Sequence, residues 1–209
     1  MVVIGIALVA AIALSSSNKA GSGATPAGSA GPVVANGSNQ TAPVGITGTA
    51  LPAFDGTLTV DPAVGQTAPA LTGVNFAGQS VAIGNDGKPK VIMFLAHWCP
   101  HCQAEVPRIQ NWLDANSMPS GVELYAVPTA TNSARPNYPP SDWLVGKNWT
   151  VPVLVDSDQS EAGSAYGLTS FPYFVAVDAN GKVVARTSGE LPTDEFAKLI
   201  DAARTGKTQ

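Results

Sequence analysis

Residues 90–102 read KVIMFLAHWCPHC, and they join an apolar run to Cys99 and Cys102, the only two cysteines among 209 residues. The run from Val91 to Ala96 has the length and composition of a strand buried on both faces. The residues between the cysteines, Pro100 and His101, indicate a turn into a helix. The sequence therefore predicts a strand that leads directly into a Cys-x-x-Cys helix start.

A cysteine at a helix start has unusual chemistry. The first N–H groups of a helix are unpaired and carry partial positive charge, which favours a thiolate over a thiol. Cys99 is then expected to attack a disulfide, and Cys102 to resolve the mixed disulfide. This predicts a thiol–disulfide oxidoreductase whose electrons pass through the two cysteines, so we expect neither an organic cofactor nor a metal.

Three other interpretations of the cysteine pair stay open. A purely structural disulfide would close a four-residue ring and contribute only about 2 kcal/mol. A zinc site needs four ligands, and beyond the cysteines only His97 and His101 are available, with His101 poorly placed between them. The cysteines could also be ordinary core residues, although the intervening turn residues disfavour this.

The charges divide the chain into two parts. With 15 acidic and 11 basic residues the net charge is −4, which gives no indication of a nucleic-acid partner. Residues 1–57 contain only Lys19 and Asp55 as charged residues, so the other 24 lie in 58–209. We therefore expect one globular domain over residues 58–209, which is long enough for a sizeable core.

The N-terminal residues 1–14 form a candidate membrane segment. Residues 2–14 are all apolar or glycine, yet 13 residues are short for a span of about 20, and the basic segment of a signal peptide is missing. A start upstream of Met1 would explain both features. We expect an uncleaved membrane anchor, with a cleaved signal peptide or a buried core helix as alternatives. The anchor or signal places the domain outside the cytoplasm, at the cell membrane or secreted.

Residues 15–57 are rich in Ser, Gly, Ala, Thr, Pro and Asn. Such a composition buries too little apolar surface to offset chain entropy. We therefore predict a flexible linker over this range.

The rest of the chain alternates between strand and helix patterns. A helix is predicted from Pro100 to Ala115, kinked at Pro107, and a terminal helix from Pro192 to Arg204 capped by Thr193. Strands are predicted at 74–76, 80–83, 90–96, 122–127 and 151–155, short helices at 141–145 and 161–166, a hairpin at 173–177 and 182–186, and a loop at 129–140. This order predicts an α/β sheet covered on both faces.

From about residue 60 to 205 the chain resembles the thioredoxin-like fold, in particular the membrane-anchored TlpA/ResA type of disulfide oxidoreductase. The resemblance rests on the opening Gly65–Pro69, the run Phe94–Cys99, Glu105 and Pro107 at the Cys-x-x-Glu-x-Pro spacing, and Tyr166-Gly167, Phe171-Pro172 and Asn180-Gly181 in that order. It implies a central mixed β-sheet flanked by helices, with an N-terminal β extension. It also implies protein thiol or disulfide substrates and an extracytoplasmic or membrane redox partner.

The resemblance assigns a role to Pro172. It corresponds to a cis-proline that lies against the cysteine pair and exposes the preceding backbone to a substrate strand; an ordinary trans proline is the alternative. Phe171 departs from the small or β-branched residue that is usual before this proline. An aromatic side chain there could change which substrates dock.

The residue His101 gives two resemblances that imply opposite directions of electron flow. Near a thiolate a histidine donates a hydrogen bond or carries positive charge, and so lowers the pKa of Cys99 and makes the disulfide more oxidising. The Pro100-His101 dipeptide is that of DsbA-like oxidases, whereas TlpA/ResA-like proteins are commonly reductants. A solvent-exposed His101 with little effect is the alternative, and His97 is expected to be exposed surface.

Two further residues support the pair by resemblance. Thioredoxins carry a buried Asp six residues before the first cysteine, and Met93 occupies that position here. Glu105 is a candidate for base assistance to Cys102, or else only a charge that favours the first turns of the helix. Trp98 is expected to shield the cysteine pair, or to pack beneath the loop.

The segment 129–150 contains Arg135, Tyr138, Trp143 and Trp149, which either form part of a docking surface or anchor the loop to the core. Two other functions remain as alternatives. A thiol peroxidase would carry Thr where Ala96 stands, and a copper-delivery protein would carry Cys-x-x-x-Cys with a distant His. The direction of electron flow, the substrate and the oligomeric state stay open.

Overall fold

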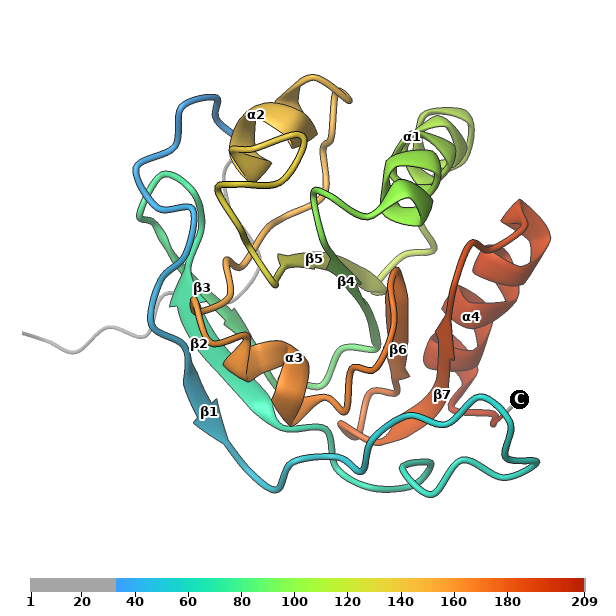
Figure 1. The fold of residues 1–209 in the computed structure, drawn as a ribbon. Coiled ribbons are helices and arrows are strands. Elements are labelled where there is room, and N and C mark those ends of the chain that lie inside the picture. The colour runs from blue at the N-terminus through green and yellow to red at the C-terminus, as the bar shows by residue number, and fades with distance from the viewer. Residues whose placement is uncertain (1–32, 209) are drawn as a thin grey trace, which may run out of the picture.

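A four-stranded mixed sheet lies at the centre of the computed structural model, which describes residues 33–208 (Figure 1). Its strand order is β5 (Glu123–Pro128), β4 (Lys90–Leu95), β6 (Tyr173–Val177) and β7 (Val183–Ser188). Strands β4 and β5 are parallel, whereas β6 is antiparallel to both β4 and β7. This sheet confirms the predicted thioredoxin-like arrangement. The expected membrane segment, residues 1–14, and residues 15–32 of the expected linker lie outside the described residues.

Both faces of the sheet are covered, which explains why β4 is apolar without alternation. Met93 and Leu95 face a core that includes α1 (Pro100–Ala115), α2 (Pro140–Val145) and α4 (Thr193–Thr205). Ile92 and Phe94 face the opposite core, which includes α3 (Glu161–Ala165). On that side lies a second, antiparallel sheet of β1 (Gly45–Thr47), β2 (Ala70–Val74) and β3 (Ser80–Ile83). This is the N-terminal β extension that the resemblance implied.

The segment 151–155 is not a strand, contrary to the sequence prediction. Only Val153 forms an isolated parallel bridge, to Ala126 of β5. The pairing with β5 does not continue past this bridge because the next β5 residue in register is Pro128. Its carbonyl accepts from the Asp156 N–H, but a proline has no N–H to donate in return. The first predicted strand is also displaced, since β2 ends at Val74.

The start of α4 differs from its prediction as well. Pro192, not Thr193, is the N-cap residue, and no side chain caps the helix. The predicted bounds of α1 are correct, with Pro107 inside the helix. We attribute this to the local signals at that helix, where Pro100 occupies the first position and the apolar residues recur at helical spacing.

Residues 33–57 pack against the domain, so the prediction of a flexible linker is wrong over this range. Leu51 is buried, and its N–H donates to the Ala165 carbonyl at 2.8 Å. The Phe54 N–H donates to the Gly167 carbonyl at 2.8 Å, and the Ala42 N–H to the Asp156 carbonyl at 3.1 Å. The polar composition of this segment misled the prediction because backbone groups, which every sequence carries, make these bonds.

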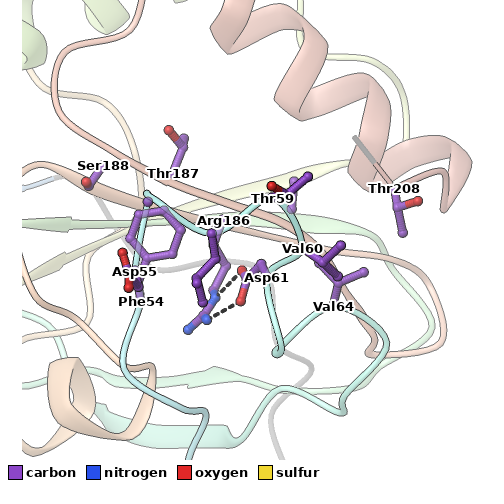
Figure 2. Close-up of a pocket in the computed structure, with 13 residues that line it drawn as sticks. Phe54, Asp55, Thr59, Val60, Asp61, Val64, Arg186, Thr187, Ser188 and Thr208 are labelled. Carbon is purple, nitrogen blue, oxygen red and sulfur yellow. Dashed lines mark hydrogen bonds and ion pairs between the residues drawn. The ribbon is translucent and has the colours of Figure 1, made fainter.

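A buried arginine fastens this N-terminal segment to β7 (Figure 2). The Arg186 side chain donates from Nε to Asp61 at 2.7 Å and from Nη1 to the Pro52 carbonyl at 2.8 Å, and its guanidinium lies over the Phe54 ring. Burial would raise the pKa of Asp61, but the hydrogen bonds and charge of Arg186 outweigh burial and lower it. The adjoining pocket of about 520 Å³ contains no cysteine, so it is separate from the redox chemistry.

Candidate active site

Cys99 and Cys102 lie at the start of α1, where β4 delivers the chain. Cys99 is the N-cap residue, and its N–H donates to the Ala96 carbonyl at 3.0 Å. Pro100 occupies the first position of the helix, where a missing N–H costs nothing. The strand and the helix start are therefore joined by one tight turn that fixes both cysteines.

The two thiols have different surroundings. Cys99 is 7% exposed, whereas Cys102 is fully buried, and both are free thiols. The Cys102 sulfur accepts from the Ala96 N–H at 3.4 Å, and burial raises the pKa of this thiol far above its usual value. Of the two thiols, therefore, only Cys99 is partly accessible to solvent.

The loop before β6 places Phe171 and Pro172 beside Cys99. The Cys99 sulfur lies 4.0 Å from the Phe171 carbonyl oxygen. The Phe171–Pro172 peptide bond is cis, as the resemblance implied. The rings of Phe171 and Trp98 meet edge to face, with centroids 5.8 Å apart. The Phe171 backbone thus lies beside the Cys99 sulfur, and the Phe171 ring packs against Trp98, which precedes Cys99 in the chain.

Trp98 is held in place by the 129–139 loop. Its Nε1–H donates to the Ala130 carbonyl at 2.8 Å, and the Arg135 guanidinium lies 4.9 Å from its ring centroid. The side chains that sequence analysis grouped in 129–150 therefore separate. Trp143 and Trp149 are buried in the core, whereas Arg135 and Tyr138 are exposed near the site.

Glu105 is a fully buried carboxyl one helical turn after Cys102. It accepts from the Leu191 N–H at 3.2 Å and from the Arg108 guanidinium. Burial raises the pKa of Glu105 although both donors oppose the rise, and its charge contributes to the raised pKa of Cys102. The Asp position of thioredoxins is filled by Met93, which is buried in the core.

The exposed His101 is paired with a residue that sequence analysis missed. Its Nδ1 lies 2.8 Å from Glu190 Oε1, and Arg108 Nη2 donates to Glu190 Oε2 at 2.7 Å. These hydrogen bonds place the pKa of Glu190 below its usual value. His101, Glu190, Arg108 and Glu105 therefore form a continuous chain of polar contacts from the surface to the interior. No sequence signal marks Glu190, because it is 89 residues from His101.

His97 is buried, so the expectation that it is surface-exposed is wrong. It is 1% exposed because the 129–139 loop folds over it. Its Nε2 accepts from the Asn132 N–H at 3.2 Å, and this leaves Nδ1 to donate to the Pro136 carbonyl at 2.7 Å. Burial lowers the pKa of His97, which favours the neutral ring that these bonds require.

Within residues 33–208, no group of three or more His, Cys, Asp or Glu side chains is arranged to hold a metal ion. Over the same part of the chain, no helix has the length and apolar character that crossing a membrane requires.

Comparisons with known proteins agree with this site. The family model described as Redoxin matches residues 63–202. The sporulation thiol-disulfide oxidoreductase A of Bacillus subtilis is 25% identical over 124 residues, which are 59% of this chain and 73% of that protein. The thiol-disulfide oxidoreductase ResA of Geobacillus thermodenitrificans is 27% identical over 143 residues, 68% of this chain and 79% of that protein. The crystal structure of StoA from Bacillus subtilis superposes with a TM-score of 0.54 at 22% identity, covering 66% of this chain and 98% of StoA.

Proposed function

We propose that this chain, which belongs to the Redoxin family and is a thiol–disulfide oxidoreductase, exchanges disulfides with protein substrates with Cys99 as nucleophile and Cys102 as resolving thiol. The observation that carries the assignment of the two roles is the contrast between their sulfurs. Cys99, at a helix start, keeps 7% of its surface exposed, whereas Cys102 is fully buried with a raised pKa.

The reaction proceeds in two exchanges. The Cys99 thiolate attacks one sulfur of a substrate disulfide, so a Cys99–substrate bond forms and the other substrate sulfur leaves as a thiolate. Cys102 then loses its proton and attacks the Cys99 sulfur. The Cys99–Cys102 disulfide forms, the second substrate thiol is released, and two electrons have passed to the substrate. The reverse sequence oxidises a substrate dithiol.

We assign Glu105 the removal of the Cys102 proton. A buried thiol with a raised pKa needs a base before it can attack, and Glu105 is a buried carboxyl one turn further along the same helix. The raised pKa of Glu105 makes it a better proton acceptor than an exposed carboxylate. Trp98, Phe171 and Pro172, which border Cys99, are assigned to the contact with the substrate.

We also propose that the domain works outside the cytoplasm, tethered to the cell membrane by residues 1–14 or secreted. The support is the uninterrupted apolar run at residues 2–14. A redox partner at the membrane or outside the cytoplasm would restore the cysteine pair after each cycle. Protease treatment of spheroplasts tests the placement, since a tethered outer domain is digested, a cytoplasmic domain is protected and a secreted domain is found in the medium.

Single cysteine variants of the full chain test the two roles. Cys99→Ser is expected to abolish reduction of a disulfide-bonded protein such as insulin. Cys102→Ser is expected to accumulate a covalent adduct with the substrate, which dithiothreitol releases. The Ser117→Ala variant, at an exposed position beyond the end of α1 opposite to the cysteines, serves as the control. Retained turnover in Cys99→Ser, or adducts through Cys102 instead, would contradict the assignment.

A further inference from the structure

The hydrogen bonding of His101 bears on the direction of electron flow. An imidazole that bonded the Cys99 sulfur would stabilise the thiolate and make the pair a strong oxidant. Instead, His101 Nδ1 bonds Glu190, and within residues 33–208 the Cys99 sulfur has its hydrogen-bond contact with the Phe171 carbonyl. The Glu190 carboxylate thus engages the side chain that the Pro-His dipeptide places next to the reactive cysteine.

Glu190 is held firmly in this position by the loop between β7 and α4. The Gly189 N–H donates to the Pro172 carbonyl at 2.8 Å, and the Leu191 N–H donates to buried Glu105 at 3.2 Å. Leu191 itself is buried, and Arg108 binds the second Glu190 oxygen. The residues on both sides of Glu190 are therefore fixed to the active site, which orients the carboxylate toward His101.

We propose that Glu190 is a positioning residue that lowers the oxidising power of the Cys99–Cys102 pair by binding His101 and placing a negative charge beside it. The inference rests on the proposed function, because it concerns the potential of the same two cysteines.

The direction in which Glu190 shifts the redox equilibrium of the cysteine pair follows from its charge. A positive group near Cys99 stabilises the thiolate, hence the reduced pair, and a negative group does the opposite. Replacing the Glu190 carboxylate by an amide removes a negative charge and releases His101 toward Cys99, so both changes stabilise the reduced pair. The effect is moderate because the side chains of His101 and Glu190 are 66% and 34% exposed, where solvent screens charge.

The test is the redox equilibrium of the full chain with glutathione at pH 6. For Glu190→Gln the constant for reduction of the pair by glutathione is expected to rise by about tenfold, which corresponds to about +30 mV. Glu190→Ala should shift the constant in the same direction, and it replaces the Gln variant if that one fails to fold. The matched control is Glu195→Gln, which removes an exposed α4 carboxylate bound to Lys198 and should stay within twofold of wild type.

A double-mutant cycle tests whether Glu190 acts on the redox equilibrium through His101. In a His101→Ala background, the Glu190→Gln change is expected to shrink to less than half on a logarithmic scale. An undiminished change, or a Glu190→Gln constant within twofold of wild type, overturns the inference while leaving the proposed function intact. A wild-type pair that does not exchange with glutathione at all would instead overturn the proposed function itself.

Discussion

His97 and His101 lie four residues apart on either side of Cys99, and the structure treats them in opposite ways. His97 is buried under the 129–139 loop, with one ring nitrogen donating and the other accepting. His101 is exposed and paired with a carboxylate. The first histidine organises the fold around the site, and the second acts on the charge near the reactive sulfur. The role of each is decided by the distant segment that it meets.

The largest expected difference between the two histidines is in stability. His97→Ala leaves the Asn132 N–H and the Pro136 carbonyl without their ring partners, and each such loss at a buried site costs about 1–3 kcal/mol. The free energy of unfolding in urea should therefore fall by about 2 kcal/mol or more. His101→Ala, which exposes no buried group, should change it by less than about 0.5 kcal/mol. Equal losses in the two variants would contradict the comparison.

The pH dependence of stability should show the same asymmetry. The pKa of His97 is lowered in the fold, so protons bind the unfolded chain first. The stability that neutral His97 provides is fully present above about pH 6.5, the ordinary value for an unfolded chain, and is lost as the pH falls toward the lowered folded value. The deficit of His97→Ala relative to wild type should thus shrink below pH 6.5. Urea unfolding at pH 7.5, 6.5 and 5.5 measures it, and a constant deficit would argue against a neutral buried ring.

The redox equilibrium should respond to His101 more than to His97. Removing the imidazole leaves Arg108 as the partner of the Glu190 carboxylate and takes away a hydrogen-bond donor near Cys99, so the thiolate is less stable. The constant for reduction of the pair by glutathione should fall by about fivefold in His101→Ala, or roughly 1 kcal/mol. His97→Ala should alter it by less than twofold. A larger shift for His97→Ala would reverse the roles that we assign to the two residues.

The smallest effect on stability is expected at Arg135, which belongs to the loop that covers His97. Its guanidinium lies over the Trp98 ring at an exposed position, where such a contact contributes about 0.5–1 kcal/mol. Arg135→Ala should therefore destabilise the chain by less than half as much as His97→Ala, and Arg135→Lys by less again. Thermal unfolding of the three variants side by side provides the measurement. If Arg135→Ala lowers stability as much as His97→Ala does, the exposed contact of Arg135 with Trp98 contributes as much to holding the 129–139 loop as the buried hydrogen bonds of His97.

Much of the fold could be predicted because its signals are local. The apolar run of β4, Pro100 at the first helical position and the spacing of apolar residues in α1 lie within consecutive residues, so the strand, the turn and the helix were placed correctly. The same holds for the hairpin of β6 and β7, whose turn contains Asn180 and Gly181. Local signals failed at 151–155, because the partner strand contains Pro128, and at residues 33–57, because backbone hydrogen bonds leave no mark in composition.

By itself, the sequence determined that Cys99 and Cys102 share one helix start at the end of a buried strand, since the apolar run, Pro100 at the first helical position and the Cys-x-x-Cys spacing lie within consecutive residues. Tertiary structure alone decided which charges surround the pair. His97 meets Pro136 across 39 residues, and His101 meets Glu190 across 89. Contacts of this length depend on how loops close over a packed core, which depends on the whole chain at once rather than on neighbouring residues.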